Sequence, residues 1–103
     1  MIKIPKTFRA AGKKYTVKWD NGKIMSRGLV GEADYSSCVV TLSKVDQTIL
    51  LTRDSVEQVF IHELWHVACN ALGEKKLGKD ERLADAFSGI FHQMLSSGKG
   101  ELV

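Results

Sequence analysis

The sequence has few of the features that mark secreted, membrane-spanning or disulfide-bonded proteins. It contains one proline and two cysteines among 103 residues, and it has no long apolar run. Cys38 and Cys69 fit neither the spacing of a zinc ribbon nor that of a redox motif, so we interpret both as small buried thiols. The stretch from Met1 to Arg9 is charged and partly alternating, unlike a signal peptide or a membrane anchor. We therefore expect a cytoplasmic protein that does not contact the membrane.

The charged residues show only a mild excess of one sign. The net charge is +3 and the sequence pI is near 9.0. Lys13-Lys14 and Lys75-Lys76 are isolated pairs rather than a stripe, and no nucleic-acid-binding motif is present, so we expect no nucleic-acid partner. Hydrophobic residues make up 44% of the chain and charged residues 26%. Residues 1–103 are thus expected to form a single globular domain that needs no disulfide.

The most informative stretch of the chain is His62-Glu63-Leu64-Trp65-His66. Two histidines four apart on an α-helix project from nearly the same face, because one turn takes 3.6 residues and the offset is about 40°. Both imidazoles can therefore reach one metal ion. Glu63 projects at a different angle and can take a proton from a water bound to that ion. This is the chemistry of the zinc hydrolase signature His-Glu-x-x-His, which requires a helix. The alternative is a chance match, with a hydrogen-bonded or exposed histidine pair.

The flanking residues predict that helix from about Asp54 to Leu72. Asp54-Ser55-Val56-Glu57 has the form of an N-terminal cap, and Gly73 is typical of the left-handed residue that ends a helix. Apolar residues surround most of the circumference, so we expect a buried helix. Burying two histidines and a glutamate is costly unless they are satisfied, and a metal ion with its water would satisfy all three.

A catalytic zinc ion usually has three protein ligands and keeps a fourth position for water, so a further donor is needed. A second helix is predicted from about Lys79 or Asp80 to Leu95, and Glu81 and Asp85 share one of its faces. The small Ala84 between them allows close approach of the two helices. We predict that Glu81 completes the ligand set and that Asp85 orients a ligand imidazole. The alternative for Glu81 is an ordinary acidic residue favoured by the helix dipole.

Other donors in this region are weaker candidates. Glu74 and Asp80 also follow the histidine pair. His92 lies about 16 Å along the second helix from Glu81, which is too far to bind the same ion. We therefore expect His92 to be a surface or core residue. Cys69 lies near the histidine face, but a carboxylate is the more economical third ligand.

Strand-like patterns fill the first half of the chain. The predicted strands are residues 2–8, 14–20, 29–35 and 38–42, and residues 48–51 form either a return strand or the approach to the helix. The first two strands are expected to form an antiparallel hairpin. Strands followed by helices predict an α+β fold, with a small, mostly antiparallel sheet of about three to five strands carrying both helices on one face. The apolar residues of the second helix follow the spacing of one buried stripe.

Two motifs together resemble those of a known family. His62-Glu63-Leu64-Trp65-His66 followed by Glu81-Arg82-Leu83-Ala84-Asp85 resembles the gluzincin zinc peptidases, whose second motif is Glu-x-x-Ser/Ala-Asp. The short separation of the motifs, and Gly31-Glu32-Ala33-Asp34-Tyr35 before a β-branched strand, are similar to small members from phages and prophages. The similarity covers about residues 29–95. It implies a minimal zincin-like domain with these roles: His62, His66 and Glu81 bind Zn²⁺, Glu63 is the base, and Asp85 supports a ligand.

The resemblance implies a metallopeptidase that hydrolyses a peptide or protein substrate. We expect the peptide to lie along Cys38–Leu42 as an added strand. Tyr35 is a possible oxyanion-stabilising residue, although strand packing is its commoner role. Because the chain is short for a substrate cleft, the alternative function is a non-catalytic zinc-binding interaction module. A hydrolase of a non-peptide amide is a third option. The sequence names no substrate, partner or oligomeric state.

Overall fold

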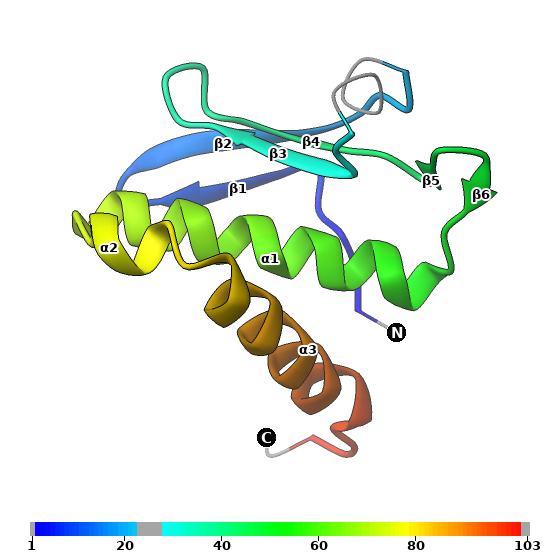
Figure 1. The fold of residues 1–103 in the computed structure, drawn as a ribbon. Helices are drawn as coiled ribbons and strands as arrows, with labels where there is room; N and C mark the ends of the chain where they lie inside the picture. Colours follow the sequence, from blue (N-terminus) through cyan, green and yellow to red (C-terminus); the bar gives the residue numbers. More distant parts are fainter. Residues whose placement is uncertain (1, 23–27, 102–103) are drawn as a thin grey trace.

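The computed structural model describes residues 2–22 and 28–101, which form an α+β fold. Strands occupy the first half of the chain and helices the second half (Figure 1). The elements in chain order are β1 Thr7–Ala10, β2 Lys13–Trp19, β3 Gly31–Asp34, β4 Val39–Leu42, β5 Val45–Asp46, β6 Ile49–Leu50, α1 Arg53–Leu72, α2 Lys75–Gly78 and α3 Glu81–Ser97.

The main sheet has four strands in the order β1-β2-β4-β3. The predicted hairpin of β1 and β2 is confirmed, with Phe8 opposite Tyr15. β4 enters between β2 and β3, and it runs parallel to β2 and antiparallel to β3. The sheet is therefore mixed, and the expectation of a mostly antiparallel sheet holds for the two outer pairings only. This order places β3 at an edge of the sheet.

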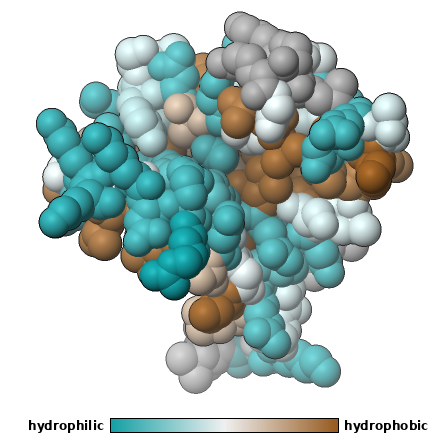
Figure 2. All heavy atoms as spheres, viewed as in Figure 1, coloured by the Kyte–Doolittle hydropathy of each residue, from teal (hydrophilic) through white to brown (hydrophobic). Residues whose placement is uncertain are grey.

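The first predicted strand is shorter than expected, and the return strand predicted as one role of residues 48–51 is confirmed. The first strand begins at Thr7 rather than Ile2, although the carbonyl oxygen of Lys6 still accepts a hydrogen bond from the Val17 N–H of β2. The stretch around Ile49 is the return strand of a separate two-stranded hairpin, β5–β6, and does not join the main sheet. Ile49 and Leu50 are largely exposed, and Figure 2 shows apolar surface over this hairpin.

The core lies between the sheet and α1. Its buried members come from β2, β4 and α1: Tyr15, Val17, Val40, Leu42, Phe60 and Val67. Phe8 stacks on Tyr15 and meets Phe60 edge-on. Burial of these apolar surfaces holds α1 across one face of the sheet. Among the described residues, both cysteines are free thiols, with Cys69 buried and Cys38 half-buried.

The start of α1 differs from the prediction, whereas its end does not. The N-cap residue is Thr52, whose hydroxyl oxygen accepts a hydrogen bond from the Ser55 backbone N–H. The predicted cap at Asp54 with Glu57 is therefore wrong. Glu57 is fully buried, and its carboxylate accepts a hydrogen bond from Arg53 instead of capping the helix. At the other end Gly73 adopts φ 73°, as predicted, and its N–H bonds the carbonyl of Asn70.

The third helix departs most from expectation. α3 begins after the Asp80 cap, close to the predicted position, and the preceding loop contains the short helix α2. However, α3 packs on α1 and descends from the side of α1 that faces away from the sheet (Figure 1). The expected buried apolar stripe holds only for the first part of α3, where Ala84 is fully buried and Phe87 packs on Trp65. Ile90, Met94 and Leu95 are more than half exposed. In Figure 2 apolar surface is visible on this helix.

No helix in the described part of the chain is long and apolar enough to span a membrane.

Candidate metal centre

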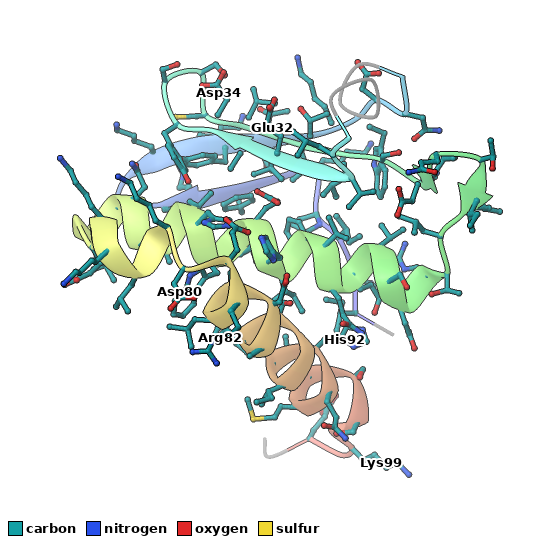
Figure 3. All side chains as sticks on the ribbon, in the orientation of Figure 1. Glu32, Asp34, Asp80, Arg82, His92 and Lys99 are labelled. Carbon is teal, nitrogen blue, oxygen red and sulfur yellow. The ribbon has the colours of Figure 1, made fainter. Side chains whose placement is uncertain are left out.

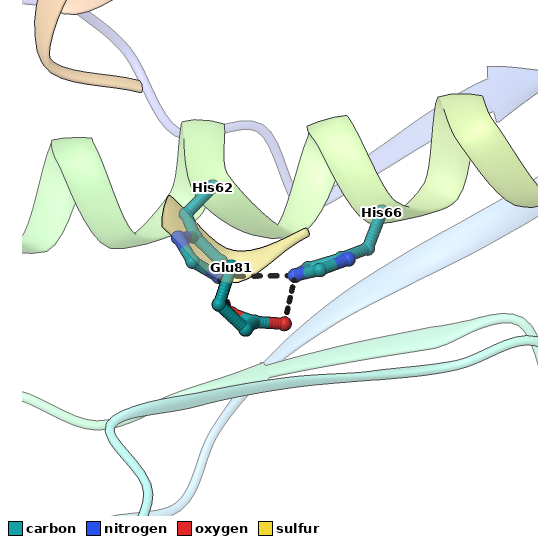
Figure 4. A group of neighbouring side chains, drawn as sticks. All are labelled: His62, His66 and Glu81. Carbon is teal, nitrogen blue, oxygen red and sulfur yellow. Dashed lines mark hydrogen bonds and ion pairs between the residues drawn. The ribbon is translucent and has the colours of Figure 1, made fainter. Parts of the chain in front are cut away.

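The two histidines of α1 meet the glutamate of α3 at one point (Figure 4). Nε2 of His62 lies 3.0 Å from Nε2 of His66, as the four-residue spacing predicts. The Glu81 carboxylate spans the pair, with Oε2 at 2.9 Å from Nε2 of His62 and Oε1 at 3.0 Å from Nε2 of His66. The structure thus brings together the three residues that the sequence predicts as ligands.

The opposite nitrogens of both imidazoles are held by acceptors. Nδ1 of His66 lies 2.8 Å from the backbone carbonyl oxygen of Gly78. Nδ1 of His62 lies 2.8 Å from Oδ1 of Asp85, which is the supporting contact predicted for that carboxylate. A carbonyl oxygen can only accept, and an ionised carboxylate likewise, so each Nδ1 donates. In the neutral imidazoles this leaves the lone pair on Nε2, the nitrogen that faces Glu81.

The resulting donor set fits a divalent cation. Two imidazole lone pairs and one carboxylate converge, and their ligand atoms all lie within 4.8 Å of one another. Nitrogen and carboxylate ligands in a two-histidine, one-glutamate set are those of catalytic zinc sites, where hydrogen bonds behind each imidazole set its orientation. Ala84 is completely buried and allows the close approach of α3. The Glu81 side chain is 65% exposed, so the site opens to solvent on one side.

Glu63 lies beside this cluster without joining it. Its side chain is buried, at 7% exposure, and burial raises its pKa to about 7. The nearby His66 opposes this shift, whereas the carboxylates of Glu81 and Glu32 add to it. A carboxylate whose pKa lies near neutrality can both accept and return a proton, which is the property required of a general base.

A cleft of about 830 Å³ opens over the cluster. One wall is β3, another is α1, and the third is formed by α2 and the beginning of α3. The expectation that a peptide could pair with Cys38–Leu42 is wrong, because β4 is paired on both sides, by β2 and by β3. The strand beside the cleft is instead β3.

Tyr35 also lines this cleft, from the turn that follows β3. Tyr35 is 37% exposed, so it is partly covered and partly open to the cleft. Partial burial raises the pKa of Tyr35 from its ordinary value, and the negative charge of Glu63 adds to this shift. A phenol of this kind can donate a hydrogen bond.

Gly31 lets β3 approach α1 at Glu63. A Cβ atom at this position would lie 2.6 Å from Cγ1 of Val59 and 3.1 Å from Oε2 of Glu63. We expect Gly31→Ala to lower the free energy of unfolding by about 1–3 kcal/mol, because β-branched Val59 must move. Denaturant unfolding measures this loss.

Gly89→Ala is the matched control for that substitution. Gly89 lies inside α3, and a Cβ atom there would meet only Oε1 of Gln58, at 4.0 Å. We expect this change to stabilise the protein by roughly 0.5–1 kcal/mol through helix propensity. Equal unfolding midpoints for Gly31→Ala and the unmodified protein would show that β3 does not need this glycine.

The remaining donor candidates lie outside the cluster. Asp80 caps α3, Glu74 is exposed at the start of α2, and Cys69 is buried away from the ligand atoms. His92 is buried in the core, which is one of the two roles predicted for it. The carbonyl of Gly78 was not predicted as the partner of His66, because every residue has a backbone carbonyl and no residue type marks this one.

No protein-family model, curated protein or solved structure matches this chain in the three comparisons made. The functional assignment therefore depends on the geometry of the site and on the motif resemblance alone.

Proposed function

We propose that this protein is a zinc-dependent metallopeptidase, a minimal relative of the gluzincins. The observation that carries the proposal is the convergence of two imidazole Nε2 atoms and the Glu81 carboxylate, with both Nδ1 atoms already bonded to acceptors. His62, His66 and Glu81 would hold the ion. When bound, zinc would supply a Lewis acid that polarises a carbonyl and acidifies a water.

The protein side chains contribute proton transfer and orientation. Glu63 accepts the proton of the attacking water and delivers it to the leaving amine. Its burial beside the cluster and its raised pKa support this role. Asp85 holds the ring of His62 through Nδ1. The Tyr35 phenol donates a hydrogen bond to the oxyanion that forms at the substrate carbonyl.

The substrate is a peptide in extended conformation that pairs with the outer edge of β3. In the described residues, β3 has a partner strand on one side only, β4, and its residues line the cleft. An extended chain added along such an edge gains backbone hydrogen bonds, whatever its side chains. This replaces Cys38–Leu42 as the proposed docking strand.

Metal removal tests the proposal directly. The purified protein should contain about one zinc per chain by elemental analysis and should cleave a peptide library. Dialysis against a chelator should abolish cleavage, and added zinc should restore it. Cleavage that survives complete loss of the metal would exclude a zinc peptidase.

A further inference from the structure

The contact between α1 and α3 has an apolar part, where Phe87 packs against Trp65 and Ala84 is fully buried, and a row of polar residues on α3. Glu81, Asp85, Ser88 and His92 follow one another at intervals of three or four, and Ser88 and His92 are buried. The apolar residues Ile90 and Met94 lie largely exposed instead. The apolar contact therefore covers only the first part of α3, and the polar row continues beyond it to His92.

The far end of this contact is a buried pair, Glu57 and His92. The Glu57 side chain is fully buried, and Nε2 of His92 lies 2.8 Å from its Oε1. Figure 3 shows His92 directed from α3 toward α1. Although burial raises the pKa of Glu57, hydrogen bonds from His92 and Arg53 outweigh that effect and lower it to about 2. The carboxylate is therefore ionised and accepts a hydrogen bond from Nε2–H of His92.

The Glu57 carboxylate accepts three hydrogen bonds, the first of them from His92. Its Oε2 accepts a hydrogen bond from Nε of Arg53 at 2.6 Å, and its Oε1 accepts a second one from the Ile2 backbone N–H at 3.2 Å. Arg53 also donates to the carbonyl oxygen of Ile2. Asp54 lies nearby, with Oδ1 at 3.9 Å from Nε2 of His92. These donor groups, one of them a guanidinium cation, leave no favourable place for a metal ion at this carboxylate.

We propose that the Glu57–His92 pair is a positioning device for the metal centre, because it fixes the α3 helix that delivers Glu81. α3 is attached to α1 at two polar points about 16 Å apart, the metal cluster near Glu81 and the hydrogen bond at His92. With both points in place, the orientation of α3 is set before an ion arrives. Without the second point, α3 can pivot, and metal binding must supply the free energy that orients Glu81.

This inference rests on the proposed metal site, and zinc affinity tests it. Competition with a chromophoric chelator measures the dissociation constant, and circular dichroism monitors folding. We expect His92→Leu to bind one zinc per chain at least tenfold more weakly than the unmodified protein. This loss matches the 10- to 100-fold effect typical of groups that support a metal site. His92→Gln retains an N–H donor and should bind zinc within about threefold of the unmodified protein. Gln93→Leu, an exposed neighbour on α3, should leave the affinity unchanged.

The outcomes separate this role from others. A purely structural role would lower the stability of the metal-free and zinc-bound forms equally and leave zinc affinity unchanged. Wild-type zinc affinity in a folded His92→Leu would therefore overturn the inference. Two zinc ions per unmodified chain, one of them lost in His92→Leu, would overturn it in favour of a second metal site. If His92→Leu does not fold, His92→Phe, which also lacks the N–H donor, decides by the same criteria. Failure of the unmodified protein to bind zinc would instead refute the proposed function.

Discussion

Glu63→Gln should abolish peptide hydrolysis while zinc stays bound. The amide keeps the size of the side chain but cannot accept the proton of the attacking water, and a positioned general base contributes about a hundredfold to ten-thousandfold in rate. Because Glu63 lies outside the group of converging ligand atoms, zinc content should not change. We therefore expect a loss of at least about a hundredfold in kcat/KM at full zinc occupancy, measured on one fluorogenic peptide.

Glu74→Gln is the matched control for this experiment. It makes the same chemical change at an exposed glutamate that does not line the cleft, so both zinc content and cleavage should remain at wild-type levels. Undiminished cleavage by Glu63→Gln would exclude Glu63 as the base. An unmodified protein that binds zinc through this site but cleaves nothing would favour the non-catalytic interaction module.

His62→Ala should lose most of the zinc affinity. This change removes one of three ligand atoms and leaves the carboxylates of Glu81 and Asp85 without the imidazole that both contact. Loss of a group that only supports a ligand typically weakens metal binding by 10- to 100-fold. Loss of the ligand itself should exceed about a hundredfold, as measured by chelator competition.

A graded series makes the assignment of roles sharper. Asp85→Asn removes charge from the group behind His62 and should fall between His62→Ala and the unmodified protein. Arg82→Ala, an exposed change beside Glu81 on α3, should leave the affinity unaltered. If Asp85→Asn bound zinc more weakly than His62→Ala does, Asp85 rather than His62 would be the ligand.

Much of the site could be predicted from the sequence because its determinants are local. The helical repeat alone places His62 and His66 on one face, and Gly73 marks the end of that helix. The same repeat puts Glu81 and Asp85 together on the next helix, around the small Ala84. The β1–β2 hairpin was also predictable, since alternation and a tight turn are features of neighbouring residues.

Contacts between distant residues decided the rest. Insertion of β4 between β2 and β3 depends on pairing across the chain, which no local pattern records, and it makes β3 rather than β4 the strand beside the cleft. The apolar spacing of α3 predicted a stripe buried along its whole length, yet only Ala84 and its apolar neighbours in the first part of α3 are covered, and polar residues of α3 contact His62 and Glu57.

By itself, the sequence determined two helices and the ligand types that each carries, because helix periodicity is a property of residues a few positions apart. Only the tertiary structure decided which faces meet, how closely β3 approaches Glu63, and that a buried carboxylate holds the far end of α3. Those outcomes depend on satisfying buried charge and packing volume among residues up to 55 positions apart in the chain.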